Sequence, residues 1–249
     1  PKDENDLIKP AVEGTQRALK AAKKAGIKRM VLTSSIVAMM GDATGTVDIN
    51  QESWTNVNAS GVSAYLKSKT LAEQSAWEFI ENQKGDHLLE LVTINPGPIY
   101  GPTLSGNLNG ESMGMYKQLI SGKMPLLPRF AINLSDVRDV AAIHVAALKN
   151  EKANGKRFIV STEKAHKGVE MAEILKENGY SKVSTKLAPN FMLRFMARFD
   201  NDLKGMLPFI GNTFNGDVSE TMKTFNWKPM PLKKTVLDTA KSVEEAMRK

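Results

Sequence analysis

Helical and strand-like apolar patterns alternate along most of the chain, and this order limits its fold more than any other feature. Apolar residues recur at three- to four-residue steps and predict helices over 7–25, 63–83, 110–120, 137–148 and 169–178. Short apolar runs between them predict buried strands at 29–35, 87–94 and 157–161. Such an order is typical of an α/β fold built on a parallel, doubly wound sheet.

Other segments carry weaker patterns. Residues 41–62 are rich in Gly, Asp, Asn and Ser without a period, which predicts a loop, and prolines end regular structure at 95–98 and 124–128. The segment 191–214 is rich in Met and Phe, including Met206, and its helical spacing predicts core packing or, alternatively, an adaptable apolar pocket wall. A last helix is predicted over 233–247.

The composition excludes several classes of function. The chain has no cysteine, so disulfides, thiolate nucleophiles and Cys-bound zinc are ruled out, and its three histidines lack the spacing of metal ligands. The net charge of +7 comes from dispersed lysines, which is typical of a solvated surface rather than of nucleic-acid binding. No apolar run approaches the roughly 18 residues of a membrane span. We therefore expect a cytoplasmic protein with no metal, nucleic-acid or membrane partner.

One helix combines a tyrosine and a lysine. Tyr65, Lys69, Ala72 and Ala76 fall on one stripe of helix 63–83, which predicts that they face inward while Glu73 points elsewhere. Alternatively, Lys69 is a solvated residue that happens to align. A tyrosine ordinarily has a pKa near 10, and an ammonium group one turn away favours the phenolate, so the pair suits general acid–base catalysis.

A hydroxyl group follows the first predicted strand. Ser35 stands where this strand ends, and it supplies a donor that orients a substrate carbonyl or, equally, caps the strand end.

Three motifs in this order resemble those of extended short-chain dehydrogenases. They are Val31–Ser35, the YxxxK motif Tyr65–Lys69, and Asn95–Pro102, with Trp54, Trp77 and Asp136–Ala141 at matching places. The likeness is greatest to the dihydroflavonol-reductase-like branch of aldehyde and ketone reductases, and it runs from Pro1 to the C-terminus. It implies a Rossmann-type sheet and an NADP cofactor, with NAD possible.

The resemblance also assigns roles to single residues. Tyr65 would protonate the carbonyl oxygen, Lys69 would bind the nicotinamide ribose, and Ser35 would hold the carbonyl. The residues implied for the cofactor are Thr33, Tyr65, Lys69, Pro96, Gly97 and Ile99, and those for the substrate are Ser35, Ile36 and Tyr65. In the family, Asp136 to Asp139 are structural.

Two departures from the family pattern stand out. Ala11 replaces an asparagine that relays protons in many relatives, and no GxxGxxG fingerprint occurs. We therefore expect an incomplete doubly wound sheet that binds the cofactor poorly by itself. Residues 1–102 would be the C-terminal half of the dinucleotide-binding domain, and residues 103–249 a smaller substrate-binding region with some returning sheet elements.

The predicted function is an NAD(P)H-dependent reductase, a monomer or homodimer, acting on a hydrophobic aldehyde or ketone. One alternative is a nucleotide-sugar epimerase or dehydratase, although Ser35–Gly41 lacks the tyrosine common in those enzymes. The other is a non-catalytic dinucleotide sensor, although such proteins usually lose the tyrosine or the lysine.

Overall fold

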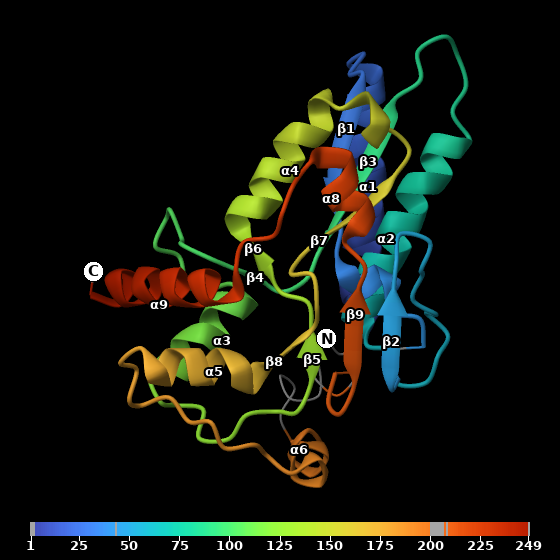
Figure 1. The fold of residues 1–249 in the computed structure, drawn as a ribbon. Helices are drawn as coiled ribbons and strands as arrows, with labels where there is room; N and C mark the ends of the chain where they lie inside the picture. Colours follow the sequence, from blue (N-terminus) through green and yellow to red (C-terminus); the bar gives the residue numbers. More distant parts are fainter. Residues whose placement is uncertain (1–2, 43, 200–206, 208, 249) are drawn as a thin grey trace.

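The computed structural model describes residues 3–42, 44–199, 207 and 209–248 (Figure 1). Its α-helices are α1 (Asn5–Lys24), α2 (Ala64–Glu81), α3 (Glu111–Ile120), α4 (Val137–Lys149), α5 (Gly168–Glu177), α6 (Asn190–Met196), α8 (Ser219–Phe225) and α9 (Leu232–Arg248). Two 3-10 helices are η1 (Ile36–Met39) and η2 (Glu151–Ala153). The strands are β1 (Arg29–Thr33), β2 (Thr46–Ile49), β3 (Glu90–Pro96), β4 (Ile99–Tyr100), β5 (Ala131–Ile132), β6 (Ser135–Asp136), β7 (Arg157–Val160), β8 (His166–Lys167) and β9 (Thr213–Gly216).

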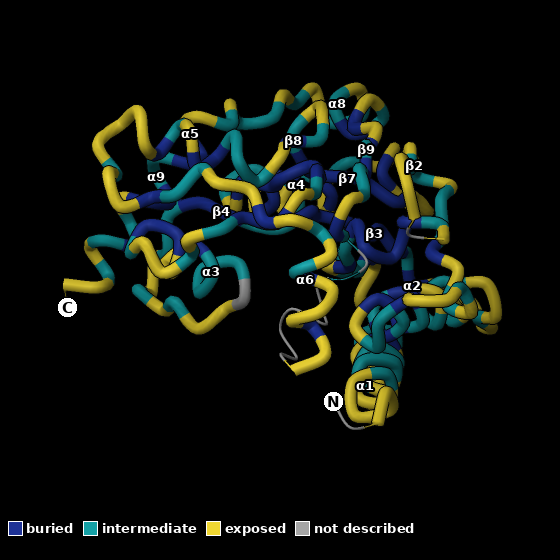
Figure 2. The backbone as a smooth tube through the Cα atoms, turned by 90° about the horizontal axis from the view of Figure 1, so that it is seen from below, coloured by how far each residue is buried: buried dark blue, intermediate teal, exposed yellow. Residues whose placement is uncertain are grey.

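A parallel sheet in the order β1–β3–β7 has helices on both faces. Successive strand residues point to opposite faces, so Leu91 packs with α1 and α2 while its neighbour Val92 packs with α4. The arrangement is visible in Figure 1, and the centre of this sheet is dark blue, or buried, in Figure 2. The predicted α/β fold with a Rossmann-type parallel sheet is confirmed.

β3 is longer at its carboxyl end than the sequence predicts. The prolines at 95–98 were expected to end the strand, but it continues through Pro96, which pairs with Val160. The Ile94 carbonyl accepts from Ser34 N and therefore faces β1. Alternate residues of a strand direct their backbone groups to the same side, so the Pro96 nitrogen, two residues later, also faces β1. Because β1 ends at Thr33, the missing N–H of Pro96 costs no ladder hydrogen bond.

A second sheet in the order β2–β9–β5–β8 lies beside the first. The expectation that residues 41–62 form only a loop is wrong, because β2 pairs in parallel with β9, from Thr46 with Thr213 to Ile49 with Gly216. Helices α3 and α5 both pack on α9. Together with this sheet they enclose the largest core cluster, which includes Phe214 and Tyr116.

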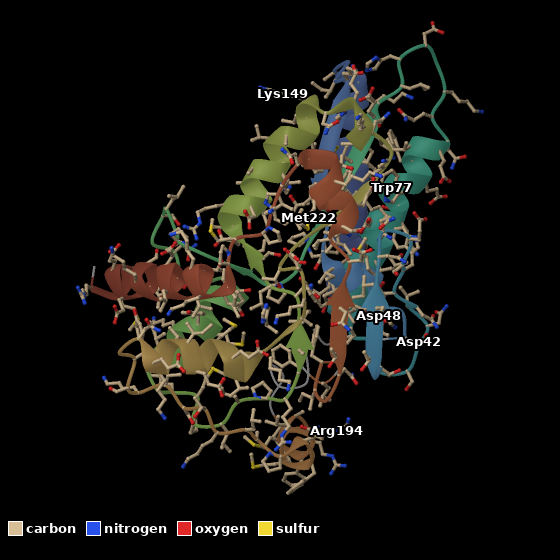
Figure 3. All side chains as sticks on the ribbon, viewed as in Figure 1. Asp42, Asp48, Trp77, Lys149, Arg194 and Met222 are labelled. Carbon is tan, nitrogen blue, oxygen red and sulfur yellow. The ribbon has the colours of Figure 1, made fainter. Side chains whose placement is uncertain are left out.

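The Met- and Phe-rich segment does not pack as core throughout. On α6 and the turn after it, Phe191, Phe195 and Phe199 are exposed, at 77%, 58% and 81%. Arg194 lies on the same short helix at the lower end of the molecule (Figure 3). The core prediction is therefore wrong for these three phenylalanines, although Leu193 is buried; Met206 lies outside the described residues.

Candidate active site

The predicted site residues gather at the carboxyl ends of two neighbouring strands. Thr33 ends β1, Ser35 follows two residues later, and Pro96 ends β3. Helix α2 packs against β3 and against η1, which begins directly after Ser35. In open α/β sheets this edge is where ligands bind.

Tyr65 and Lys69 lie one turn apart near the start of α2. Ser63 caps the helix by accepting a hydrogen bond from Leu66 N (3.4 Å), so Tyr65 is the second helical residue. The Lys69 Nζ atom lies 6.0 Å from the centroid of the Tyr65 ring. Tyr65 is 41% exposed and Lys69 is half-buried, so the expectation that the tyrosine faces inward is wrong. The pair instead borders the surface, where a substrate has access.

The three other tyrosines of the chain differ from Tyr65 in their surroundings. Burial raises the pKa of Tyr100 and of Tyr116 far above the ordinary value, and the Tyr116 hydroxyl donates to the Val236 carbonyl (2.5 Å). Burial and the nearby Glu244 also raise the pKa of Tyr180. Near neutral pH these three phenols are therefore poorly suited to proton transfer.

Ser35 lies at the junction between β1 and η1. Its backbone is extended and its Oγ atom accepts from Val37 N (3.3 Å), so it caps η1. Its carbonyl accepts from the Asn95 amide (3.2 Å). Ile36, predicted to contact the substrate, is fully buried in the core, so the structure does not bring its side chain to the surface where Tyr65 lies.

Glu73 was predicted to point away from the sheet, and that prediction is wrong. The residue is 1% exposed, and its Oε1 atom accepts from Arg157 Nε at 2.7 Å. Its Oε2 atom accepts from Ser34 Oγ (2.5 Å) and Asn95 Nδ2 (2.7 Å). The spacing in the sequence does carry a signal for this burial, since Glu73 continues the stripe of Tyr65 and Lys69 by one more turn.

The turn after β3 is fixed by close packing. Gly97 donates to Ser135 Oγ (2.9 Å), and Ser135 N donates to the Pro98 carbonyl (3.0 Å). A Cβ atom on Gly97 would lie 2.0 Å from the Asn133 carbonyl oxygen, so no side chain fits there. The packing of the protein against itself therefore requires glycine at position 97, and the turn from Pro96 to Ile99 is rigid.

The Thr33 hydroxyl lies at the carboxyl end of β1. Thr33 is exposed, and its Oγ1 atom lies 2.7 Å from His144 Nε2 on α4. The other ring nitrogen of His144 lies 2.7 Å from the Val140 carbonyl. Because a backbone carbonyl only accepts, Nδ1 carries the hydrogen in neutral His144 and Thr33 donates to Nε2.

An apolar pocket lies beyond the turn, between α3, α5 and the segment that leads into β5. Pro98 borders it, and Tyr100, Met115, Tyr116, Met124, Phe130 and Met171 line it. His166 on its wall bonds Glu170 (2.7 Å). Burial raises the pKa of Glu170, but the hydrogen bonds from His166 and Lys167 N and the charge of Lys164 together outweigh this and leave the pKa below its usual value.

Asp136 and Asp139 hold α4 and the C-terminal segment together. Asp136 caps α4 by accepting from Arg138 N (2.9 Å), and it also accepts from Thr235 Oγ1 (2.7 Å). Asp139 accepts from the Trp227 indole (3.1 Å) and from Met230 N (2.7 Å). In the described part of the chain both carboxylates are occupied by these structural contacts.

Among the described residues, no group of three or more histidines and carboxylates is arranged to hold a metal ion. None of the described helices combines the length and the apolar character needed to cross a membrane.

Comparison with protein families and curated proteins finds clear relatives. The profile of the NAD dependent epimerase/dehydratase family matches residues 1–161. An uncharacterized oxidoreductase of Saccharomyces cerevisiae is 31% identical over 242 residues, which cover 88% of this chain and 69% of that protein. The NADPH-dependent methylglyoxal reductase of the same yeast is 33% identical over 64% of this chain and 51% of its own length. A Medicago truncatula cinnamoyl-CoA reductase is 34% identical over 69% of this chain and 52% of its own. The chain thus spans about half the length of these two reductases.

Solved structures agree with the sequence relatives. The crystal structure of the yeast methylglyoxal/isovaleraldehyde reductase Gre2 complexed with NADPH superposes with a TM-score of 0.73 at 28% identity. The match covers 99% of this chain and 73% of that one.

Proposed function

Because the chain belongs to the NAD-dependent epimerase/dehydratase family, we propose that the protein it represents is an NADPH-dependent reductase of an aldehyde or ketone. The observation that carries this proposal is the pairing of Tyr65 with Lys69 at the strand ends, 6.0 Å from ring centroid to Nζ. The named reductases among its relatives support the same reaction class.

In the proposed reaction Tyr65 is the general acid. Its hydroxyl donates a proton to the carbonyl oxygen of the substrate, which becomes an alcohol, and the phenolate left behind is stabilised by the Lys69 ammonium group. Ser35, held at the end of β1 by its bond to Asn95, orients the carbonyl with its hydroxyl. The other tyrosines are excluded from this role because burial raises the pKa of each.

The residues at the strand ends fit a nicotinamide nucleotide. Lys69 offers an ammonium group to ribose hydroxyls, Thr33 offers an exposed hydroxyl, and the rigid turn Pro96–Ile99 offers backbone groups. When bound, the reduced nicotinamide supplies the hydride. We propose NADPH because the yeast reductase and its crystal complex carry that cofactor in their names.

The proposed substrate is a small, hydrophobic carbonyl compound. The pocket beside Pro98 supports this, since tyrosine, phenylalanine and methionine side chains line it. Most of these residues follow position 102, which supports our division into a catalytic region (1–102) and a substrate-binding region (103–249). The cytoplasmic location and the oligomeric state, monomer or homodimer, stay predictions.

The test measures loss of NADPH absorbance with a panel of aldehydes and ketones. It uses both the chain and an extended protein, in which a GxxGxxG segment taken from a related reductase is joined ahead of the chain. We expect turnover that falls by about 100-fold or more in Tyr65→Phe, which removes only the hydroxyl. Turnover that is equal in Tyr65→Phe, or no reduction of any carbonyl, would overturn the proposal and favour a sugar-nucleotide enzyme or a sensor.

A further inference from the structure

A single buried carboxylate gathers donors from four elements of the fold. Glu73 accepts hydrogen bonds from Ser34, Thr93, Asn95, Arg157 and, within its own helix, Trp77. The donors come from the end of β1, from β3, from β7 and from α2 itself, where Trp77 is labelled in Figure 3. Such a set of bonds to a residue only 1% exposed fixes one arrangement of the strands around the helix.

The position of Glu73 along α2 links it to the proposed catalytic pair. Residues at steps of four share one face of a helix, so Tyr65, Lys69 and Glu73 form one stripe. The first two members of the stripe border the surface, and the third is anchored inside the sheet. Any rotation or slide of α2 that moved Tyr65 would therefore have to break the bonds of Glu73.

The same carboxylate also determines where Ser35 lies. Ser34, the residue before it, donates to Glu73 Oε2 at 2.5 Å. Asn95 donates one N–H to Glu73 Oε2 (2.7 Å) and another to the Ser35 carbonyl (3.2 Å). Ser34, which precedes Ser35, and Asn95, which donates to the Ser35 carbonyl, are thus both held by Glu73.

The chemistry of this position requires a carboxylate. Oε2 accepts from two donors and Oε1 from three, which an amide cannot do because its NH2 group has no acceptor lone pair. Arg157 balances the charge and is itself fixed by the carbonyls of Gln51 and Ser53 (2.9 and 2.6 Å). Its guanidinium also lies 3.7 Å from the centroid of the Trp54 ring.

We propose that Glu73 is a positioning residue for the reaction: it holds the Tyr65–Lys69 face of α2 and the Ser35 end of β1 in one fixed geometry. It touches neither substrate nor cofactor. This inference rests on the proposed function for its catalytic meaning, but the positioning itself is measurable without turnover.

The test compares Glu73→Gln with the matched control Glu90→Gln. Glu90 also accepts from a buried arginine, Arg29 Nε at 2.6 Å, and also joins neighbouring strands, but at the opposite ends of β1 and β3. In the chain, hydrogen exchange over residues 34–40 should rise about tenfold or more in Glu73→Gln, because bonds to a charged group are lost, and stay unchanged in Glu90→Gln. In the extended protein, Glu73→Gln should lower kcat by about tenfold or more with KM within about twofold, and the control should keep its kcat.

Each outcome decides a separate question. Equal exchange and equal kcat in the two variants would overturn the proposal and leave Glu73 as a structural ion-pair partner. If the unaltered extended protein reduces no carbonyl, the proposed function fails, while the exchange data still decide whether Glu73 orders the Ser34–Ser35 segment. If Glu73→Gln does not fold, Ser34→Ala is used in its place, because this variant keeps the ion pair between Glu73 and Arg157 and removes only the hydrogen bond from Ser34 to Glu73. Unchanged hydrogen exchange over residues 35–40 in Ser34→Ala would overturn the proposal.

Discussion

Gly97→Ala tests how tightly the turn after β3 is packed. The added Cβ atom would lie 2.0 Å from the Asn133 carbonyl oxygen, more than 1 Å inside ordinary contact. Asn133 has little freedom to move, because its side chain donates to the Thr162 carbonyl (2.6 Å) and accepts from Gly216 N (2.7 Å). The turn must therefore move instead.

The cost follows from the contacts that are lost. Overpacking a closed site costs about 1–3 kcal/mol, and losing the hydrogen bond from Gly97 to Ser135 adds about 1 kcal/mol. We expect the free energy of unfolding to fall by about 3 kcal/mol, which for a chain of this size lowers Tm by about 6–12 °C. The assay is thermal and urea unfolding followed by circular dichroism.

A matched glycine provides the control. Gly14 lies inside α1, and a Cβ atom there would have its nearest neighbour, an Arg17 nitrogen, at 4.0 Å. Gly14→Ala should raise the free energy of unfolding by about 0.5–1 kcal/mol, since alanine loses less backbone entropy in a helix. If Gly97→Ala unfolds at the temperature of the unaltered chain, the reasoning about the turn is refuted.

Two further predictions concern stability. Burial raises the pKa of Asp136, but hydrogen bonds from Arg138 and Thr235 outweigh this and hold it below its ordinary value of 3.8. The stability that these bonds contribute is therefore full above pH 3.8 and is lost as the pH falls through the folded-state pKa. Asp136→Asn should flatten the fall in urea stability below pH 3.8, and an equal fall would contradict this assignment. Phe214→Ala should cost about 3–5 kcal/mol because the ring is fully buried, whereas the exposed Phe195→Ala should stay within about 0.5 kcal/mol, and equal urea midpoints would disprove the assigned burial.

The parallel sheet was predictable because its signal is local. Each of β1, β3 and β7 is a short apolar run; β3 and β7 are buried along nearly their whole length and β1 is half-buried, so composition alone identifies them. The second sheet gives no such signal. β2 is four residues long, half polar, and pairs with β9 at Thr213, far along the chain, so nothing near Thr46 indicates a strand.

The site was predictable in part for a similar reason. Tyr65 and Lys69 follow from helical spacing, which is a property of the segment itself. The burial of Glu73 depends on donors from three strands, and a charged residue in a sequence window gives no indication of them. The exposure of Phe195 could not be predicted either, because an apolar side chain is buried only where the fold provides a surface for it to pack against.

The contact between Gly97 and Asn133 also limits how such a sequence can diverge. A Cβ atom at Gly216 would meet Ile36 at 3.1 Å and the Asn133 side chain at 3.5 Å, so three segments distant in the chain converge on one crowded point. The clash at Gly97 is with a backbone oxygen, which no substitution at position 133 removes. Homologous sequences should therefore keep glycine at position 97, and should vary at Asn133 and Gly216 jointly or not at all, even where the exposed face of α6 changes freely.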